Sequence, residues 1–297
     1  MREGIITRYE GNIYSPNIEA DDYVLQCTIG CSHNKCTFCD MYKDKKYRVR
    51  ELDEIINDIN LAKEYYGDIE KVFLADGDAL TMATDDLSTV LDYLYNSFPS
   101  LKYVGTYAST ASILGKTLPE LIKLQNHGLV EAHLGIESGD EKVLSDIKKG
   151  VTYCEIVEAG KMIREAGIRL FATVILGLAG RTAKAFEHAR NTARICNDIQ
   201  PDYIGVLTIL VQPGTELYEK TQRGEFEVPT DMEIFEEMRA MMKGLYLENS
   251  GFTSIHSSNR LYIEGFLPAD KGEFLNKLSL VIEGKDTSNL RSPGKTL

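Results

Sequence analysis

Hydrophobic residues in the middle of the chain follow two alternating patterns. Short runs rich in β-branched and aromatic residues predict buried strands. They alternate with longer segments whose apolar residues recur every three or four positions, as on one face of a helix. The predicted strands are 23–29, 71–75, 102–108, 130–134, 169–176 and 203–210. The predicted helices are 51–66, 85–96, 118–127, 155–166 and 183–198.

The strand-then-helix order, with six strands in all, predicts parallel strands joined by right-handed crossovers. A closed barrel of this kind usually has eight units. Six units therefore favour an α/β fold of the partial (β/α)6 TIM-type barrel class, open at one side. A flat, doubly wound sheet is the alternative, because strand order cannot be inferred from one sequence. In both architectures ligands bind beyond the C-terminal ends of the strands.

The alternation ends after Pro213. Residues 231–247 predict a Met-rich helix and residues 269–282 another, while the end of the chain is polar and contains Pro and Gly, which is typical of a loose tail. We therefore expect four parts: an N-terminal extension (1–21), a core (22–220), a small helical C-terminal extension that is a candidate lid or substrate region (221–284), and a tail (285–297).

Composition narrows the class of protein. A hydrophobic fraction of 43% and a charged fraction of 26% are typical of a globular protein. The formal charge of −12 argues against a nucleic-acid partner. No apolar run approaches the ~20 residues that span a bilayer, and the first residues lack the apolar core of a signal peptide. These features predict a cytoplasmic protein with no membrane partner.

Three of the six cysteines lie in one loop directly after the first predicted strand. Cys31, Cys36 and Cys39 fall within nine residues, and in a reducing cytoplasm such clustering favours metal binding over disulfides. Three soft thiolate ligands with no fourth cysteine closely following suit an iron–sulfur cluster with one open iron. The surrounding patterns predict that the other three are packed hydrophobic residues: Cys27, Cys154 and Cys196.

A structural zinc site formed by Cys27 and the three loop cysteines is the alternative. Zinc sites with four cysteine ligands generally pair two short knuckles separated by a longer stretch, whereas these four cysteines crowd within thirteen residues. Cys27 also lies within a strand pattern, so its side chain need not face the loop. The spacing favours an iron–sulfur cluster, and a zinc site remains the alternative.

The spacing Cys-x4-Cys-x2-Cys, with Phe38 before the last cysteine, resembles the radical S-adenosylmethionine (radical SAM) superfamily, whose usual signature is Cys-x3-Cys-x2-Cys with an aromatic residue there. The longer loop is similar to that of elongator-like and cobalamin-associated members. The resemblance covers about residues 22–220. It implies that Cys31, Cys36 and Cys39 ligate a [4Fe–4S] cluster and that the open iron binds S-adenosylmethionine (SAM).

Segments after the next strands extend the resemblance. Asp76, Gly77 and Asp78 resemble the Gly-Gly-Glu position of the superfamily, which implies contacts with the methionine ammonium of SAM. Ser109, after the third strand, stands where relatives often place a polar SAM contact. Taken alone, the acidic segment also fits an ordinary turn of the kind that Asp and Gly favour.

The segment after the fourth strand, 135–139, together with 148–150 resembles the Gly-x-Glu-Ser-Gly…Lys/Arg-Gly pattern of coproporphyrinogen-oxidase-like and elongator-like members. This implies that Glu137 hydrogen-bonds the SAM ribose and that Lys149 pairs with the methionine carboxylate. Lys148 is an alternative to Lys149 for that role, and a solvated charge at a helix end is another interpretation.

The segments 177–182 and 212–218 resemble turns of the same families after the fifth and sixth strands. The resemblance implies that Ile175, Leu210 and Val211 flank the adenine of SAM with apolar surface. Considered singly, each of these residues also fits a role in core packing.

The resemblance implies an enzyme that uses a [4Fe–4S] cluster to cleave SAM reductively. An electron donor such as ferredoxin or flavodoxin would reduce the cluster, and the resulting 5′-deoxyadenosyl radical would abstract hydrogen from an unidentified small-molecule or peptide substrate. A non-enzymatic zinc-stabilised adaptor, or an electron-transfer iron–sulfur protein, is the competing class.

A polar cluster in the C-terminal extension, residues 254–260, is a candidate substrate contact. His256 can act as an acid or base near neutral pH, and Arg260 can bind a carboxylate or phosphate. A polar surface loop that packs on the barrel is the alternative interpretation.

Overall fold

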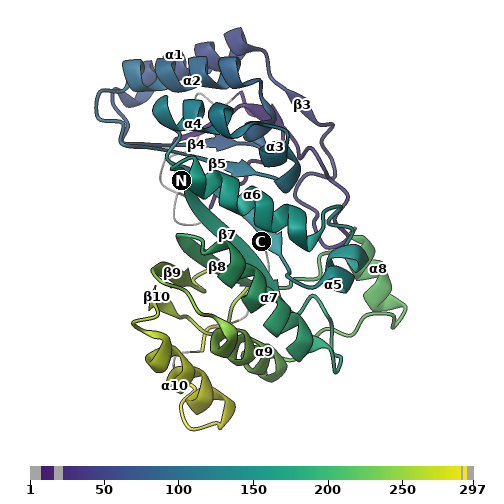
Figure 1. The fold of residues 1–297 in the computed structure, drawn as a ribbon. Helices are drawn as coiled ribbons and strands as arrows, with labels where there is room; N and C mark the ends of the chain where they lie inside the picture. The colour runs from purple at the N-terminus through teal and green to yellow at the C-terminus, as the bar shows by residue number, and fades with distance from the viewer. Residues whose placement is uncertain (1–7, 17–22, 289, 293–297) are drawn as a thin grey trace. The chain divides into compact units, whose positions relative to one another are not determined.

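The computed structural model describes residues 8–16, 23–288 and 290–292. Its main sheet has the hydrogen-bonded strand order β1-β4-β5-β6-β7-β8-β9-β10, and β2 pairs with β3 separately (Figure 1). The strands are β1 (Tyr23–Gln26), β2 (Thr28–Ile29), β3 (Arg48–Val49), β4 (Lys71–Ala75), β5 (Tyr103–Ala108), β6 (Glu131–Glu137), β7 (Arg169–Leu176), β8 (Tyr203–Thr208), β9 (Ser250–Thr253) and β10 (Glu264–Leu267).

Helices follow most strands of the sheet. They are α1 (Leu52–Tyr66), the 3-10 helix η2 (Ala79–Thr81), α2 (Thr84–Ser97), α3 (Thr110–Leu114), α4 (Leu118–Asn126), α5 (Glu141–Asp146), α6 (Tyr153–Glu165), α7 (Ala185–Ile199), α8 (Glu216–Gln222), α9 (Asp231–Gly244) and α10 (Lys271–Ile282). None of the helices in the described part of the chain is both long and apolar enough to cross a membrane.

The strand order follows the order of the chain, without the reversal that defines a doubly wound sheet. Since β1 and β10 stand at the two ends of this order, the sheet does not close. The prediction of an open, partial barrel is therefore confirmed, and the flat doubly wound alternative is wrong.

The chain forms two compact units. The first comprises residues 1–34, 41–134 and 161–170, and the second comprises 35–40, 135–160 and 171–297. The chain passes from one unit to the other within β6, α6 and β7 and twice within the cysteine loop. The predicted N-terminal extension and tail lie partly outside the described residues.

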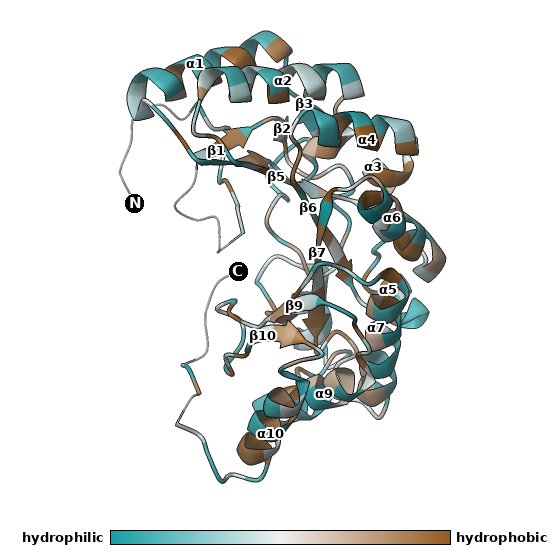
Figure 2. Cartoon of the chain, turned by 60° about the vertical axis from the view of Figure 1, so that its left-hand side comes forward, coloured by the Kyte–Doolittle hydropathy of each residue, from teal (hydrophilic) through white to brown (hydrophobic). Residues whose placement is uncertain are grey.

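The first unit pairs β1 with β4, β4 with β5 and β5 with β6, all in parallel. Helix α1 packs against α2, and α2 packs against α4. Ile55, Ile59 and Ala62 are fully buried on one face of α1, as their spacing predicts. Figure 2 shows hydrophilic residues interrupting the apolar ones along α1 and α2, as expected of helices with a single buried face.

The second unit pairs β7 with β8 and β8 with β9 in parallel, and β9 with β10 in antiparallel orientation. Helix α9 packs against both α7 and α10. A capping box formed by Thr230 and Glu233 fixes the start of α9. The C-terminal extension is therefore not only helical, because it also contributes β9 and β10 to the sheet.

Strand β9, Ser-Gly-Phe-Thr, has Phe252 as its one large apolar residue, so its sequence does not predict a strand. Its Gly251 is required by packing, because a Cβ there would lie 2.2 Å from the Tyr203 ring of β8. The same device occurs one strand earlier, where a Cβ on Gly205 would lie 2.5 Å from the Phe171 ring. Aromatic rings of one strand thus lie across a glycine of the next.

Candidate cofactor site

The loop that follows β2 carries the three clustered thiols. Cys31, Cys36 and Cys39 are all of intermediate exposure. Cys31 belongs to the first unit, and Cys36 and Cys39 belong to the second. Within the described ranges, no three His, Cys, Asp or Glu side chains gather as they would around a metal ion. The assignment of these three cysteines as cluster ligands therefore stays a prediction.

Cys27, the fourth thiol near the loop, differs from the other three. It is fully buried, and burial raises the pKa of its thiol to about 12, so the thiolate that binds metal is disfavoured. The prediction that Cys27 is a packed residue is confirmed. The donor set that remains on the loop is three thiols, which fits an iron–sulfur cluster with an open iron better than a four-cysteine zinc site.

The two cysteines outside this region differ from one another. Cys196 is buried in α7, and burial raises the pKa of its thiol to about 12, as predicted for a packed residue. Cys154 is exposed, so the same prediction is wrong there. It lies at the start of α6, whose apolar face is formed by Ile156, Ala159 and Ile163.

In the second unit, Phe38 anchors the end of the cysteine loop. Phe38 is 8% exposed and lies in an apolar cluster against which Cys36, Cys39 and Val211 pack. The Thr37 N–H donates to the Ile147 carbonyl at 2.9 Å, and the Leu217 N–H donates to the Thr37 carbonyl at 2.8 Å. The remaining buried members of this cluster are Val143, Ile147, Ile175, Leu178, Ile209 and Leu217.

This cluster contains two of the three residues expected to flank adenine. Ile175 is one of its buried members, and Val211 packs against it. Leu210, beside Val211 in the chain, is half-buried. The cluster thus offers apolar surface next to Cys36 and Cys39, and the adenine contacts themselves stay a prediction.

Glu137 and Lys149, expected to bind different parts of SAM, contact each other. The Lys149 Nζ donates to Glu137 Oε1 at 2.8 Å. Glu137 ends β6 with a φ of 62°, a conformation that is uncommon for a residue other than glycine and is enriched at functional sites. Its carboxylate lies over Gly135, where a Cβ would stand 2.3 Å from Oε1. Lys148 instead pairs with Glu216 of α8, which favours Lys149 as the residue that acts together with Glu137.

In the first unit, Asp76, Gly77 and Asp78 follow β4. Both carboxylates are fully buried, and groups of the protein donate hydrogen bonds to both. Ser109 caps the start of α3, and its backbone N–H donates to Asp78 Oδ1 at 3.2 Å. The structure thus brings these four predicted residues together, although the contacts it gives them are with the protein.

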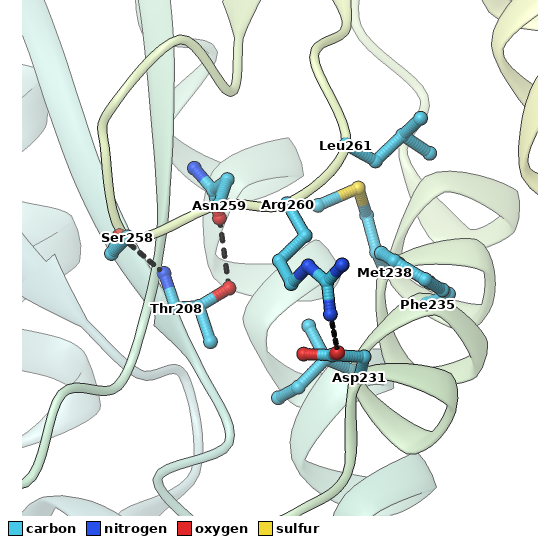
Figure 3. Close-up of a pocket in the computed structure, with 9 residues that line it drawn as sticks. Thr208, Asp231, Phe235, Met238, Ser258, Asn259, Arg260 and Leu261 are labelled. Atoms are coloured by element: carbon cyan, nitrogen blue, oxygen red, sulfur yellow. Dashed lines mark hydrogen bonds and ion pairs between the residues drawn. The ribbon is translucent and has the colours of Figure 1, made fainter. Parts of the chain in front are cut away.

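In the second unit, Arg260 forms an ion pair with Asp231 at the start of α9 (Figure 3). Beside it, the Thr208 N–H donates to Ser258 Oγ at 3.0 Å, and the Thr208 hydroxyl donates to Asn259 Oδ1 at 2.8 Å. The cavity between these residues and α9 measures about 20 Å³, which is enough for one water molecule but not for an organic substrate. These contacts fit the interpretation as a packed polar loop, and a substrate role for Arg260 stays a prediction.

His256 is expected to titrate below the ordinary histidine range. Its Nδ1 lies 2.8 Å from Ser258 Oγ, and burial lowers its pKa from the usual 6.5. Because the folded-state pKa is depressed, the neutral ring stabilises the fold above pH 6.5, and this contribution is lost as the pH falls through the lower folded-state value. An NMR titration of the imidazole, assigned with His256→Gln, measures the midpoint. A midpoint at or above 6.5 would contradict this environment.

Several residues beside the site were not predicted from the sequence. Lys45, Gln26, Ser32 and Ser112 all contact the two buried aspartates, and their positions show no pattern that could have revealed this. Glu237, in contrast, could have been found from the sequence pattern. It is a lone carboxylate on the apolar face of α9, three residues after Ile234 and four before Met241.

Comparisons with known proteins agree with this fold. The family model "Radical SAM superfamily" matches residues 25–193, more than half of the chain. The heme chaperone HemW of Bacillus subtilis is 22% identical over 225 residues, which cover 72% of this chain and 58% of that protein. The anaerobic magnesium-protoporphyrin IX monomethyl ester cyclase of Cereibacter sphaeroides is 27% identical over 201 residues, which cover 67% of this chain and 32% of that protein.

Solved structures show the same fold at low identity. Coproporphyrinogen III oxidase (HemN) from Escherichia coli matches 75% of this chain and 52% of its own, with a TM-score of 0.55 and 14% identity. Methylornithine synthase (PylB) matches 76% of this chain and 63% of its own, with a TM-score of 0.53 and 17% identity. The chain thus spans less than two thirds of the length of these curated relatives. On the family match, the chain belongs to the radical SAM superfamily.

Proposed function

We propose that this protein is an enzyme that uses a [4Fe–4S] cluster, held by Cys31, Cys36 and Cys39, to cleave SAM reductively and generate a 5′-deoxyadenosyl radical that abstracts hydrogen from a substrate. The observation that carries the proposal is the contrast among the thiols: three partly exposed cysteines share one loop, while Cys27 is buried. Members of the superfamily generally use this cluster together with SAM. When bound and reduced, the cluster would supply the electron that breaks a carbon–sulfur bond of SAM.

The residues of the second unit offer complementary groups for SAM. The Glu137 carboxylate can accept hydrogen bonds from the two ribose hydroxyls, and the Lys149 ammonium can pair with the methionine carboxylate. In the structure these two side chains pair with each other, so SAM would replace one partly buried contact by two. Ile175, Leu210 and Val211 would supply apolar surface for adenine and keep water away from it.

The reaction also requires an electron donor and a substrate. A ferredoxin or flavodoxin is the proposed donor. The substrate is a small molecule or a peptide, and His256 and Arg260 are the proposed residues on its side of the site. The C-terminal extension would then act as a lid or substrate region of the enzyme.

Anaerobic reconstitution with iron and sulfide, followed by absorbance and EPR spectra with and without SAM, tests the proposal. We expect a brown protein whose reduced EPR signal changes when SAM is added, and which releases 5′-deoxyadenosine in the presence of a reductant. A colourless zinc protein would contradict the proposal. A cluster whose spectrum is the same with and without SAM would instead favour electron transfer.

A further inference from the structure

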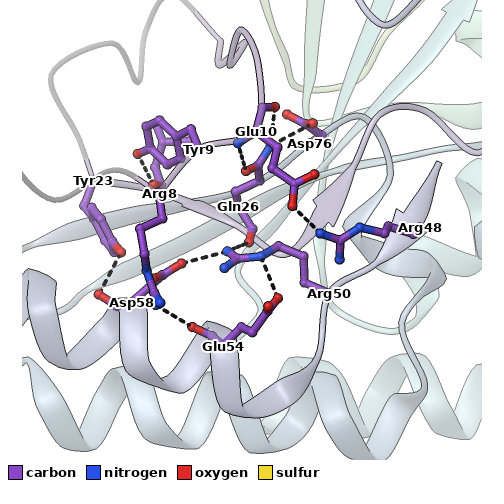
Figure 4. A network of polar contacts seen from close by, with 11 residues as sticks. Arg8, Tyr9, Glu10, Tyr23, Gln26, Arg48, Arg50, Glu54, Asp58 and Asp76 are labelled. Atoms are coloured by element: carbon purple, nitrogen blue, oxygen red, sulfur yellow. Dashed lines mark hydrogen bonds and ion pairs between the residues drawn. The ribbon is translucent and has the colours of Figure 1, made fainter. Parts of the chain in front are cut away.

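Asp76 directly follows β4 and binds three groups with a single oxygen. Its Oδ2 accepts from the Gly30 N–H at 2.8 Å, from the Gln26 amide at 3.0 Å and from the Lys45 ammonium at 2.9 Å. Figure 4 shows Gln26 between Asp76 and Glu10 in the polar network of this region. The side chains of Asp76 and Lys45 are 0% and 4% exposed, so this ion pair is buried.

Asp78, two residues later, is also fully buried. Its Oδ2 accepts from the Ser32 hydroxyl. Its Oδ1 accepts from the Ser112 hydroxyl at 2.6 Å and from the Ser109 N–H at 3.2 Å. Both oxygens of this carboxylate therefore have donors from the protein.

The two carboxylates hold the two neighbours of Cys31. Gly30, before it, binds Asp76, and Ser32, after it, binds Asp78. The backbone adds a third link, since the Gly77 N–H donates to the Gly30 carbonyl at 3.1 Å. The contact is close, because a Cβ on Gly77 would lie 3.1 Å from the Cβ of Cys31.

The same oxygen of Asp76 also reaches the far end of the loop. Lys45 follows the last cysteine by six residues, whereas Gly30 precedes the first cysteine by one. One buried carboxylate thus ties together the two ends of the segment that carries all three thiols. Fixing the ends of a loop lowers the entropy that its residues lose when they bind a ligand.

We infer that Asp76 and Asp78 are positioning residues, which fix the backbone on both sides of Cys31 so that its thiolate is oriented for metal binding. The inference rests on the proposed function. It differs from the role expected by resemblance, in which these carboxylates contact the ammonium of SAM directly. Groups that orient metal ligands commonly change metal affinity by about 10–100-fold when they are removed.

Ser32→Ala and Ser112→Ala form a matched pair that separates positioning from a merely structural role. Each variant removes one hydroxyl that donates to Asp78. The Ser112 hydroxyl also accepts a hydrogen bond from the Ser109 N–H in the capping box of α3. Ser112→Ala therefore removes this helix-capping contact in addition to the contact with Asp78. Only Ser32 is adjacent to a proposed ligand. If these residues have only a structural role, Ser112→Ala should accelerate cluster loss more than Ser32→Ala does. If Asp78 positions Cys31, Ser32→Ala should accelerate it more.

The measurement is the rate at which an iron chelator removes the cluster from anaerobically reconstituted protein, together with SAM affinity by equilibrium binding. We expect Ser32→Ala and Asp78→Asn to lose iron about tenfold faster than the native protein, and Ser112→Ala to stay within about twofold. Equal rates for Ser32→Ala and Ser112→Ala would overturn the inference. So would an Asp78→Asn protein that keeps its cluster at the native rate and loses only SAM affinity.

A second measurement on the cluster-free protein keeps the inference separate from the proposed function. The alkylation rate of each loop cysteine is determined by mass spectrometry, with Cys36 and Cys39 as internal references. We expect Ser32→Ala to change the rate at Cys31 severalfold and to leave the references unchanged, whereas Ser112→Ala leaves all three unchanged. An unchanged rate at Cys31 in Ser32→Ala would overturn the inference. Failure of the native protein to take up any cluster would refute the proposed function. The alkylation comparison would still decide whether the contact between Ser32 and Asp78 positions Cys31.

Discussion

Replacing Cys36 with alanine is expected to abolish cluster uptake and SAM cleavage. Two thiolates cannot ligate the three irons that the protein must hold. Cys27, the other thiol near the loop, is not suited to replace the lost ligand, because it is fully buried and burial raises its pKa to about 12. Iron and sulfide content after anaerobic reconstitution should fall to background. The yield of 5′-deoxyadenosine should equal that of a sample without reductant.

Two further cysteine variants serve as controls for this experiment. Cys154→Ala removes an exposed thiol and should leave iron content and SAM cleavage unchanged. Cys27→Ala tests the four-cysteine zinc alternative, and we expect it to retain its iron. Undiminished 5′-deoxyadenosine production by Cys36→Ala would refute the ligand assignment, and complete metal loss in a folded Cys27→Ala protein would favour zinc.

The fold was largely predictable because its signal is local and repeated. Each helix of the core buries one face, and that burial imposes a period of about 3.6 residues on the sequence. The parallel strands are buried on both faces, and that burial gives short continuous apolar runs. Strand β9 has no such signal, since its one large apolar residue is Phe252 and it contains Gly251, whose role is to leave room for the Tyr203 ring. Its place beside β8 depends on a contact between segments about fifty residues apart in the chain.

The candidate site was predictable only as far as it is contiguous in sequence. The cysteine loop and the short segments at strand ends can be recognised residue by residue. The partners of those residues cannot, because Lys45 reaches Asp76 and Ser112 reaches Asp78 across more than thirty positions. The pairing of Glu137 with Lys149 likewise depends on the positive φ of Glu137 and the missing Cβ of Gly135. Gly135 belongs to the motif, but the motif does not show the positive φ of Glu137 or that its carboxylate lies over this glycine.

Glu237 of α9 is a buried group whose removal should strongly destabilise the fold. Its side chain is 1% exposed, and its two oxygens each lie 3.1 Å from the Gly177 N–H. His188 of α7 places Nδ1 at 2.8 Å from Oε1 and is itself 1% exposed. Gly177 follows β7 directly, so this carboxylate fixes the turn that carries Leu178 into the apolar cluster around Phe38.

Glu237→Ala should therefore lower the free energy of unfolding by about 3–5 kcal/mol, because it leaves the Gly177 N–H and the His188 ring buried without their partner. Glu237→Gln keeps one acceptor oxygen and should cost about 1–3 kcal/mol. Glu236→Ala, one residue earlier and only half-buried, should stay within about 0.5 kcal/mol of the native protein. Urea denaturation followed by circular dichroism measures all three variants. A Glu237→Ala protein as stable as Glu236→Ala would mean that α9 packs against α7 through its apolar face alone, and that the turn after β7 does not depend on this carboxylate.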